Sequence, residues 1–171
     1  MYPIHYTHTL CITFLQDYIV TVHGFSESKD SMTVLIDDGE HKPPTFKNII
    51  EGFKRLSEES QPGDVVFVQF SGHGGRVLGS TPDEEADTYD EVLAPADYEQ
   101  SGLIRDTLIF KTLIAPMRFG VTVTILIDAC DTGMMVDLPY VWSTRRDKPG
   151  KVAKVCAFLL MILFATSMFH S

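Results

Sequence analysis

The sequence predicts an α/β fold, a sandwich of helices around a mostly parallel sheet. Two apolar runs carry this prediction, VVFVQF at residues 65–70 and VTVTILI at residues 121–127. Runs of this length that are rich in Val and Ile are typical of buried strands in a parallel sheet. Segments with helical spacing alternate with strand-like segments along the chain, which is the order expected of an α/β sandwich.

The elements before the first run alternate between helix and strand. Apolar residues at helical spacing predict a helix over residues 12–23, and Gly24 can end it. An apolar run predicts a strand over residues 31–38. Thr45 can cap a helix that continues to about Ser60 with its apolar residues on one face.

Between the two runs we expect a loop, a short strand and a helix. Residues 79–89 are acidic and rich in turn residues, which predicts a surface loop. Residues 91–95 can form a short strand, and Asp106 can cap a helix over residues 108–117. A turn at Gly120 then leads into the second run, and neither an internal repeat nor a second domain is evident.

The composition indicates a globular domain with an acidic surface. The chain has 171 residues, 44% hydrophobic and 22% charged, and its formal net charge is −9. This charge argues against nucleic acid as a partner, because a nucleic-acid surface needs clustered Lys and Arg. A cationic partner suits it better, either a divalent metal or a basic peptide.

The three cysteines, Cys11, Cys130 and Cys156, have no CxxC spacing and are odd in number. We therefore expect neither a disulfide framework nor a zinc site, and a reducing compartment, the cytoplasm, is the simpler expectation.

The C-terminal end is apolar and follows basic residues. Residues 143–154 form a basic linker, and residues 155–169 carry no charge. This stretch is shorter than the roughly 17–20 residues that a spanning helix needs, which favours a helix or strand buried in the protein. The basic flank leaves a second interpretation open, a tail anchored in a membrane and facing the cytosol. The N-terminus lacks the basic and apolar regions of a signal peptide.

Each apolar run delivers one reactive side chain at its end, His73 after the first and Cys130 after the second. Carboxyl ends of parallel strands meet at one edge of a sheet, where active residues of α/β proteins gather. A His in a glycine-rich turn or a single Cys is more often structural. A thiol and an imidazole brought together make a nucleophile and its base, so the pair predicts a catalytic site.

Side-chain alternation adds Ser71 and Asp128, which lie two residues before His73 and Cys130 and therefore on the same faces. A carboxylate close to a thiol opposes thiolate formation unless a cation neutralises it. A substrate Arg or Lys can be that cation, which makes Ser71 and Asp128 the expected floor of a pocket for basic residues. In the alternative interpretation Asp128 caps a neighbouring loop.

Three motifs together resemble the metacaspases, a family of the caspase-like cysteine peptidase clan. They are SGHGG, the stretch YDEVLAPADY at residues 89–98, and the DAC, TG and DLPY groups within residues 128–140. The similarity runs from about Phe14 to Trp142 and implies a caspase-like catalytic core over residues 1–142, a three-layer caspase-like sandwich. Residues 155–171 then form a separate apolar tail.

The resemblance implies cleavage of peptide bonds after Arg or Lys by a Cys/His dyad. Cys130 matches the nucleophile and His73 the general base and acid. The backbone N–H groups of Gly74 and Cys130 match the oxyanion hole. Ser71 and Asp128 match the family's pocket for the basic residue, in agreement with the alternation argument.

The resemblance also implies a calcium site, with Asp90, Asp106 and Asp137 at the matching positions. Three carboxylates and waters can hold calcium, which takes about six to eight oxygen ligands. The family has a further Asp where Thr107 stands, so we expect weakened binding. No loop of the EF-hand type is present.

Two departures from the family pattern bear on activity. Asp131 follows Cys130 where the family usually has His, and a carboxylate beside the sulfur disfavours the thiolate. The family's first strand and its Gly-Cys-x-x-Asp pocket segment have no counterpart at the N-terminus. The chain thus resembles a core trimmed at both ends, an incomplete sandwich whose open strand edges would favour aggregation.

The expected function is that of a cysteine endopeptidase, a monomer that acts on peptide or protein substrates with Arg or Lys at the cleaved position. A second interpretation is a catalytically impaired metacaspase-like protein that acts by protein binding, favoured by Asp131, Thr107 and the absent pocket segment. A third is a faulty gene model that lacks an upstream exon and reads through into the apolar tail.

Overall fold

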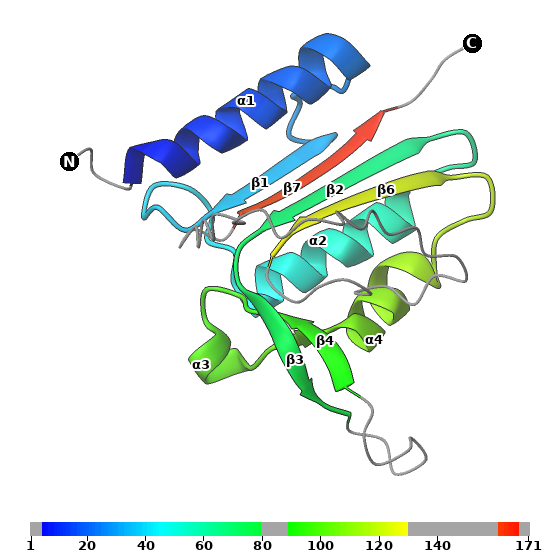
Figure 1. Cartoon of the computed structure of the whole chain (residues 1–171). Coiled ribbons are helices and arrows are strands. Elements are labelled where there is room, and N and C mark those ends of the chain that lie inside the picture. The colour runs from blue at the N-terminus through cyan, green and yellow to red at the C-terminus, as the bar shows by residue number, and fades with distance from the viewer. Residues whose placement is uncertain (1–4, 80–88, 130–160, 168–171) are drawn as a thin grey trace, which may run out of the picture.

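Figure 1 shows the computed structural model of the chain, which describes residues 5–79, 89–129 and 161–167. The helices and strands follow the alternating order expected from the sequence. They are α1 (His5–His23), β1 (Met32–Ile36), α2 (Phe46–Glu59), β2 (Val65–Ser71), β3 (Gly74–Leu78), β4 (Tyr89–Leu93), α3 (Tyr98–Ser101), β5 (Ile104–Arg105), α4 (Asp106–Ile109), a π-helical turn (Phe110–Ile114), β6 (Thr122–Asp128) and β7 (Met161–Ser167).

The main sheet has four strands in the order β1-β7-β2-β6. Strand β2 pairs in parallel with β6, whereas β7 is antiparallel to both β1 and β2. Strands β1, β2 and β6 therefore run in the same direction and end at the same rim. The prediction of an α/β fold with a mostly parallel sheet is confirmed.

Helices cover both faces of this sheet, which gives the predicted three layers (Figure 1). On one face α1 places Ile19 against a cluster that includes Phe25 and half-buried Phe67. The rings of Phe25 and Phe67 meet edge to face, with centroids 6.3 Å apart. On the other face α2 and α4 pack on alternate residues of β1 and β2. The fully or nearly fully buried members of this second cluster are Leu35, Ile49, Phe53, Leu56, Val66, Val68, Phe70, Leu93, Ile104, Ile109 and Leu113.

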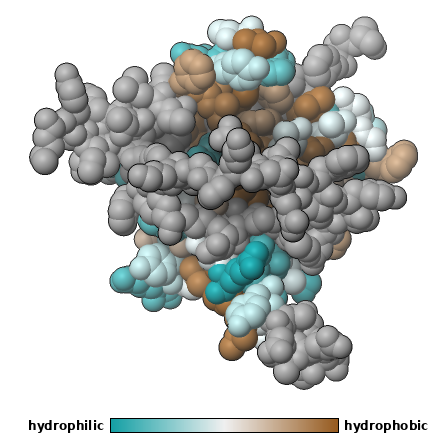
Figure 2. Space-filling view, in the orientation of Figure 1, coloured by the Kyte–Doolittle hydropathy of each residue, from teal (hydrophilic) through white to brown (hydrophobic). Residues whose placement is uncertain are grey.

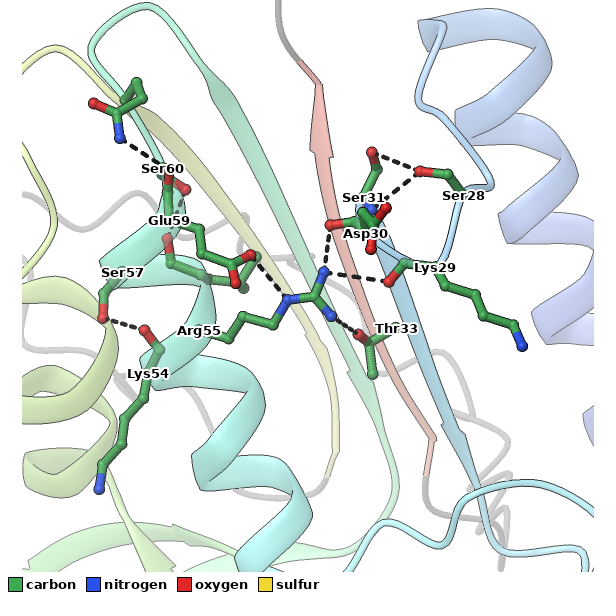
Figure 3. A network of polar contacts seen from close by, with 12 residues as sticks. Ser28, Lys29, Asp30, Ser31, Thr33, Lys54, Arg55, Ser57, Glu59 and Ser60 are labelled. Carbon is green, nitrogen blue, oxygen red and sulfur yellow. Dashed lines mark hydrogen bonds and ion pairs between the residues drawn. The ribbon is translucent and has the colours of Figure 1, made fainter.

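The second helix begins as predicted at its cap, Thr45, whose hydroxyl accepts the Asn48 N–H at 3.3 Å. An Arg on its outer side ties the helix to the strand next to it (Figure 3). Arg55 donates to the Thr33 hydroxyl at 3.2 Å, to the Lys29 carbonyl at 3.2 Å and to the carbonyl of Asp30. These contacts hold the start of β1 and the segment before it against α2.

The prediction that residues 121–127 form a strand buried on both faces is wrong in one respect. Strand β6 forms, but its residues alternate between half-buried and exposed, and Thr122, Thr124, Leu126 and Asp128 are exposed. Among the described strands β6 lies at the edge of the sheet, and its exposed residues all lie on one of its two faces.

The apolar segment near the C-terminus contributes a strand. Residues 161–167 form β7, which lies between β1 and β2 and pairs with five residues of the first and seven of the second. Of the two interpretations of the tail, this arrangement agrees with the strand packed on the core. None of the helices in residues 5–79 and 89–129 has the length and apolar character needed to cross a bilayer.

A second, antiparallel sheet of β3, β4 and β5 extends from the first (Figure 1). The sequence predicts only a turn at the glycines after His73 and a short strand near residues 91–95, so β3 and β5 are additional to the prediction. Asp106 is the first residue of α4 and not its cap, a position that Arg105 occupies.

The exposed side of α1 carries both apolar and polar residues. Phe14, Tyr18 and Val22 are exposed at helical spacing, and Asp17 and Thr21 are exposed on the same helix. Figure 2 accordingly shows hydrophobic and hydrophilic groups side by side on the described surface.

Candidate active site

The rim at the carboxyl ends of β1, β2 and β6 collects the predicted catalytic and pocket residues that the structure describes. Ser71, the last residue of β2, is the register partner of Asp128, the last residue of β6. The Gly72 N–H donates to the Asp128 carbonyl at 3.2 Å, which continues the pairing one residue beyond the strand. Ser71 and Asp128 are thus neighbours across two strands, as expected if the two apolar runs form parallel strands that end at one rim.

The two pocket candidates differ in their surroundings. Ser71 is half-buried, and its hydroxyl accepts a hydrogen bond from the side-chain amide of buried Gln69. Asp128 is exposed at the open side of the edge strand. An exposed carboxylate keeps its hydration when free and can pair with a cation that arrives from solvent. The geometry therefore allows Asp128 to bind a guanidinium or ammonium group, with the Ser71 hydroxyl beside it.

His73 lies where the chain passes from the main sheet into the second sheet. Its carbonyl accepts the Ala94 N–H at 2.9 Å, and the next residue, Gly74, begins β3 opposite Leu93. These contacts with β4 and the residue that follows it fix the backbone of His73. The side chain is exposed at the rim, two residues beyond Ser71.

Cys130 lies outside the described residues, as do Asp131 and Asp137. Ala129 is the last described residue after β6. The contact between the Cys130 thiol and the His73 imidazole, and the oxyanion hole of Gly74 and Cys130, therefore stay predictions.

A pocket of about 470 Å³ opens beside His73. Its lining residues come from the segments after β1 and β2, from the loop between β4 and α3, and from the two ends of the α3 region. They are Asp37, His73, Ala94, Pro95, Ala96, Tyr98 and Leu103. Tyr98 is 49% exposed and Leu103 37% exposed, so both side chains present apolar surface beside this pocket. This pocket was not predicted from the sequence, although Tyr98 ends one of the motifs that resemble the metacaspases.

Asp97 anchors the loop that forms one wall of this pocket. Its carboxylate accepts the Phe46 N–H at 2.7 Å and the Ser101 hydroxyl at 2.6 Å. Burial raises the pKa of Asp97, but these hydrogen bonds outweigh it, and the pKa lies below its ordinary value. The loop is therefore fixed to the first turn of α2 by an ionised carboxylate.

The two calcium candidates that the structure describes already have protein partners. The Asp90 carboxylate is buried and forms an ion pair with Arg105. Asp106 accepts the N–H of Glu91 at 3.3 Å and that of Thr107 at 2.5 Å. Within the described part of the chain no three His, Cys, Asp or Glu side chains come together as a metal site. Arg105 therefore competes with any other cation for the Asp90 carboxylate, and calcium could use Asp90 as a ligand only if this ion pair opened.

Comparison with known proteins consistently finds metacaspases. A family model described as a metacaspase, peptidase C14 domain, matches residues 6–139. Metacaspase III c of Phaeodactylum tricornutum is 43% identical over 126 residues, 74% of this chain and 37% of that protein. Metacaspase-1B of Aspergillus terreus is 41% identical over 119 residues, 68% of this chain and 31% of that protein. Metacaspase-1 of Sclerotinia sclerotiorum is 36% identical over 138 residues, 79% of this chain and 32% of that protein. The chain spans about a third of the length of these curated relatives.

Proposed function

The chain belongs to the metacaspase family of cysteine peptidases, and on that premise we propose that it cleaves peptide bonds after Arg or Lys with Cys130 as nucleophile and His73 as general base and acid. The observation that carries the proposal is the register of the rim, where Ser71 and Asp128 lie side by side. His73 and Cys130 each follow one of these residues by two positions. Two residues of chain span at most about 7 Å, so both reactive groups start close to the same point.

In this mechanism the His73 imidazole takes the thiol proton, and the thiolate of Cys130 attacks the carbonyl carbon of the scissile bond. The N–H groups of Gly74 and Cys130 stabilise the charge on the carbonyl oxygen. His73 then gives its proton to the leaving amine, and water releases the acyl group from sulfur. Asp128 and Ser71 hold the basic side chain of the substrate during these steps.

The role of Asp128 gives the test of specificity. Asp128→Asn keeps the size of the side chain and removes its charge. We expect kcat/KM to fall by about 30-fold for a peptide with Arg before the cleaved bond, since a hydrogen bond to a charged group contributes about 2 kcal/mol. The same peptide with citrulline, an uncharged isostere of Arg, should change little, and parallel assays of the two peptides measure the difference.

Asp17→Asn, a matched change on the exposed side of α1, should leave both peptides unaffected. An equal loss on the Arg and citrulline peptides in Asp128→Asn would remove Asp128 from the specificity pocket.

Calcium stimulation belongs to the same proposal, with Asp137 joining Asp90 and Asp106 as oxygen ligands. Arg105 competes for Asp90, so Arg105→Ala should raise calcium affinity by about tenfold, measured by titration calorimetry. Arg76→Ala is the control, because it removes a similar ion pair beside the site: Arg76 lies 3.4 Å from Glu91, which is next to Asp90 on β4. Equal calcium affinities in the two variants would contradict the assignment of Asp90 as a ligand.

A second candidate function is protein binding without catalysis, and Asp131 beside the nucleophile favours it. Labelling with a thiol-reactive peptide that carries Arg separates the two candidates. Rapid modification of Cys130 that depends on His73 supports the enzyme, and its absence supports the binding protein. We further propose a monomer in the cytoplasm that binds no nucleic acid. The alternative, membrane attachment through residues 155–169, would require β7 to leave the sheet.

A further inference from the structure

We propose that the pocket beside His73 binds the first residue on the leaving-group side of the cleaved bond and selects a large apolar side chain there. This inference rests on the proposed peptidase function and adds a second determinant of specificity to it. The pocket at Ser71 and Asp128 would bind the Arg or Lys on the acyl side of the cleaved bond. The pocket of Tyr98 and Leu103 would bind the residue on the leaving-group side.

The position of the pocket in the sheet supports this assignment. At the rim, the register places Ile36 of β1 opposite Met161 of β7, Met161 opposite Ser71, and Ser71 opposite Asp128. Neighbouring strands lie about 4.8 Å apart, so Ile36 is about 10 Å from Ser71 on one side, whereas Asp128 is about 5 Å away on the other. Asp37, the residue after Ile36, lines the pocket, which therefore extends from His73 away from the strand that leads to Cys130.

The chemistry of the reaction places the leaving group on this side of His73. When the tetrahedral intermediate collapses, the carbon–nitrogen bond breaks, the acyl group stays on sulfur, and the amine nitrogen takes the proton from the imidazolium. The leaving nitrogen must therefore be within hydrogen-bonding distance of His73, while the carbonyl carbon is held at sulfur. A substrate that satisfies both conditions continues past His73 toward the pocket.

The lining favours an apolar side chain. Ala94, Pro95 and Ala96 form one wall, and the exposed side chains of Tyr98 and Leu103 contribute apolar surface that a ligand can cover. A volume of about 470 Å³ lies within the range of small ligand pockets, about 300–1,000 Å³. Asp37 adds a carboxylate, which would repel an acidic residue at this position.

The walls are fixed before a ligand arrives. The Ala94 N–H donates to the His73 carbonyl at 2.9 Å, and the Ala96 N–H donates to the Pro44 carbonyl at 3.0 Å. On the opposite side Asp38 accepts the N–H groups of Glu40 and His41, both at 2.9 Å, which lowers the pKa of Asp38 to about 2. A pocket whose loops are held in this way binds without a large ordering cost.

The test compares three peptides that share an Arg acyl side and carry Leu, Gly or Asp as the first leaving-side residue. The full chain should show the highest kcat/KM for Leu and the lowest for Asp, each step about tenfold. Leu103→Ser should remove most of the preference for Leu over Gly. Ala96→Trp places a large side chain in the pocket from an exposed position, so this variant should cleave the Gly peptide faster than the Leu peptide. Leu78→Ser is the matched control, since Leu78 is 63% exposed on β3, and should keep the preference.

An arginyl chloromethyl ketone, which has no leaving-side residue, separates this inference from the proposed function. Its rate of reaction with Cys130 should be the same in Leu103→Ser as in the unaltered chain. Equal rates for the Leu and Asp peptides together with normal labelling would overturn the pocket and leave the peptidase standing. If labelling and cleavage both fail, the proposed function fails. NMR titration of the chain with leucinamide then tests the pocket by itself. Chemical-shift changes at the Ala96 N–H support binding in the pocket, and no changes overturn it.

Discussion

Replacing His73 with Ala is expected to lower kcat for an Arg-containing peptide by about 10³-fold, because general acid and base catalysis contributes about 10²–10⁴-fold. Cys130→Ala should abolish the reaction above the uncatalysed rate, since the acyl group then has no acceptor. The double variant should be no slower than Cys130→Ala alone. Groups that act as one unit show this non-additivity.

His41 offers the matched control. It is exposed, and its Nδ1 lies 2.7 Å from Asp38 in the loop after β1. His41→Ala should therefore retain kcat within about twofold. Comparable losses in the two His variants would show that general damage to the rim, and not proton transfer, explains the effect of His73→Ala.

Replacing Ala165 with Pro is expected to lower the free energy of unfolding by about 3 kcal/mol or more. Ala165 lies in β7 opposite Met32 on one side and Phe67 on the other. In a strand with neighbours on both sides each N–H belongs to a ladder, so the Pro ring removes one hydrogen bond and disturbs the spacing of three strands. Urea unfolding followed by circular dichroism measures the change.

Ala165→Gly provides the comparison, because it keeps the N–H and should cost only about 0.5–1 kcal/mol. Equal stabilities for the Pro and Gly variants would mean that β7 is not required between β1 and β2.

The parts of the fold that local pattern controls could be predicted from the sequence. Thr45 caps α2 as expected, and the apolar run at residues 65–70 forms β2 within one residue of its predicted end. The place of β7 in the sheet could not be predicted, because periodicity does not tell a strand from a buried helix in a uniformly apolar segment. Strand β3 was missed because its glycines favour a turn locally, and the pairing with β4 overrides that preference.

The position of the pocket candidates was predictable from two local rules. Alternation placed Ser71 on the same face as His73 and Asp128 on the same face as Cys130, and the expectation that parallel strands end at one rim brought Ser71 and Asp128 together, as their register shows. Neither rule predicted how exposed the two side chains are. The rules could not find the Arg105 ion pair with Asp90, which depends on the approach of β5 to β4. They also could not find the pocket of Asp37, Tyr98 and Leu103, whose members come from three separate loops and strand ends.

The central claim is that the Cys130 thiol and the His73 imidazole meet at one rim of the sheet. Alkylation by iodoacetamide at about pH 6 tests it most directly, because the thiolate is the reactive form and an adjacent imidazolium stabilises it. Peptide mass spectrometry follows Cys130, with Cys11 and Cys156 as internal references. We predict that Cys130 reacts at least about tenfold faster than the reference cysteines and that His73→Ala removes this advantage. A Cys130 rate that is the same with and without His73 would contradict the account.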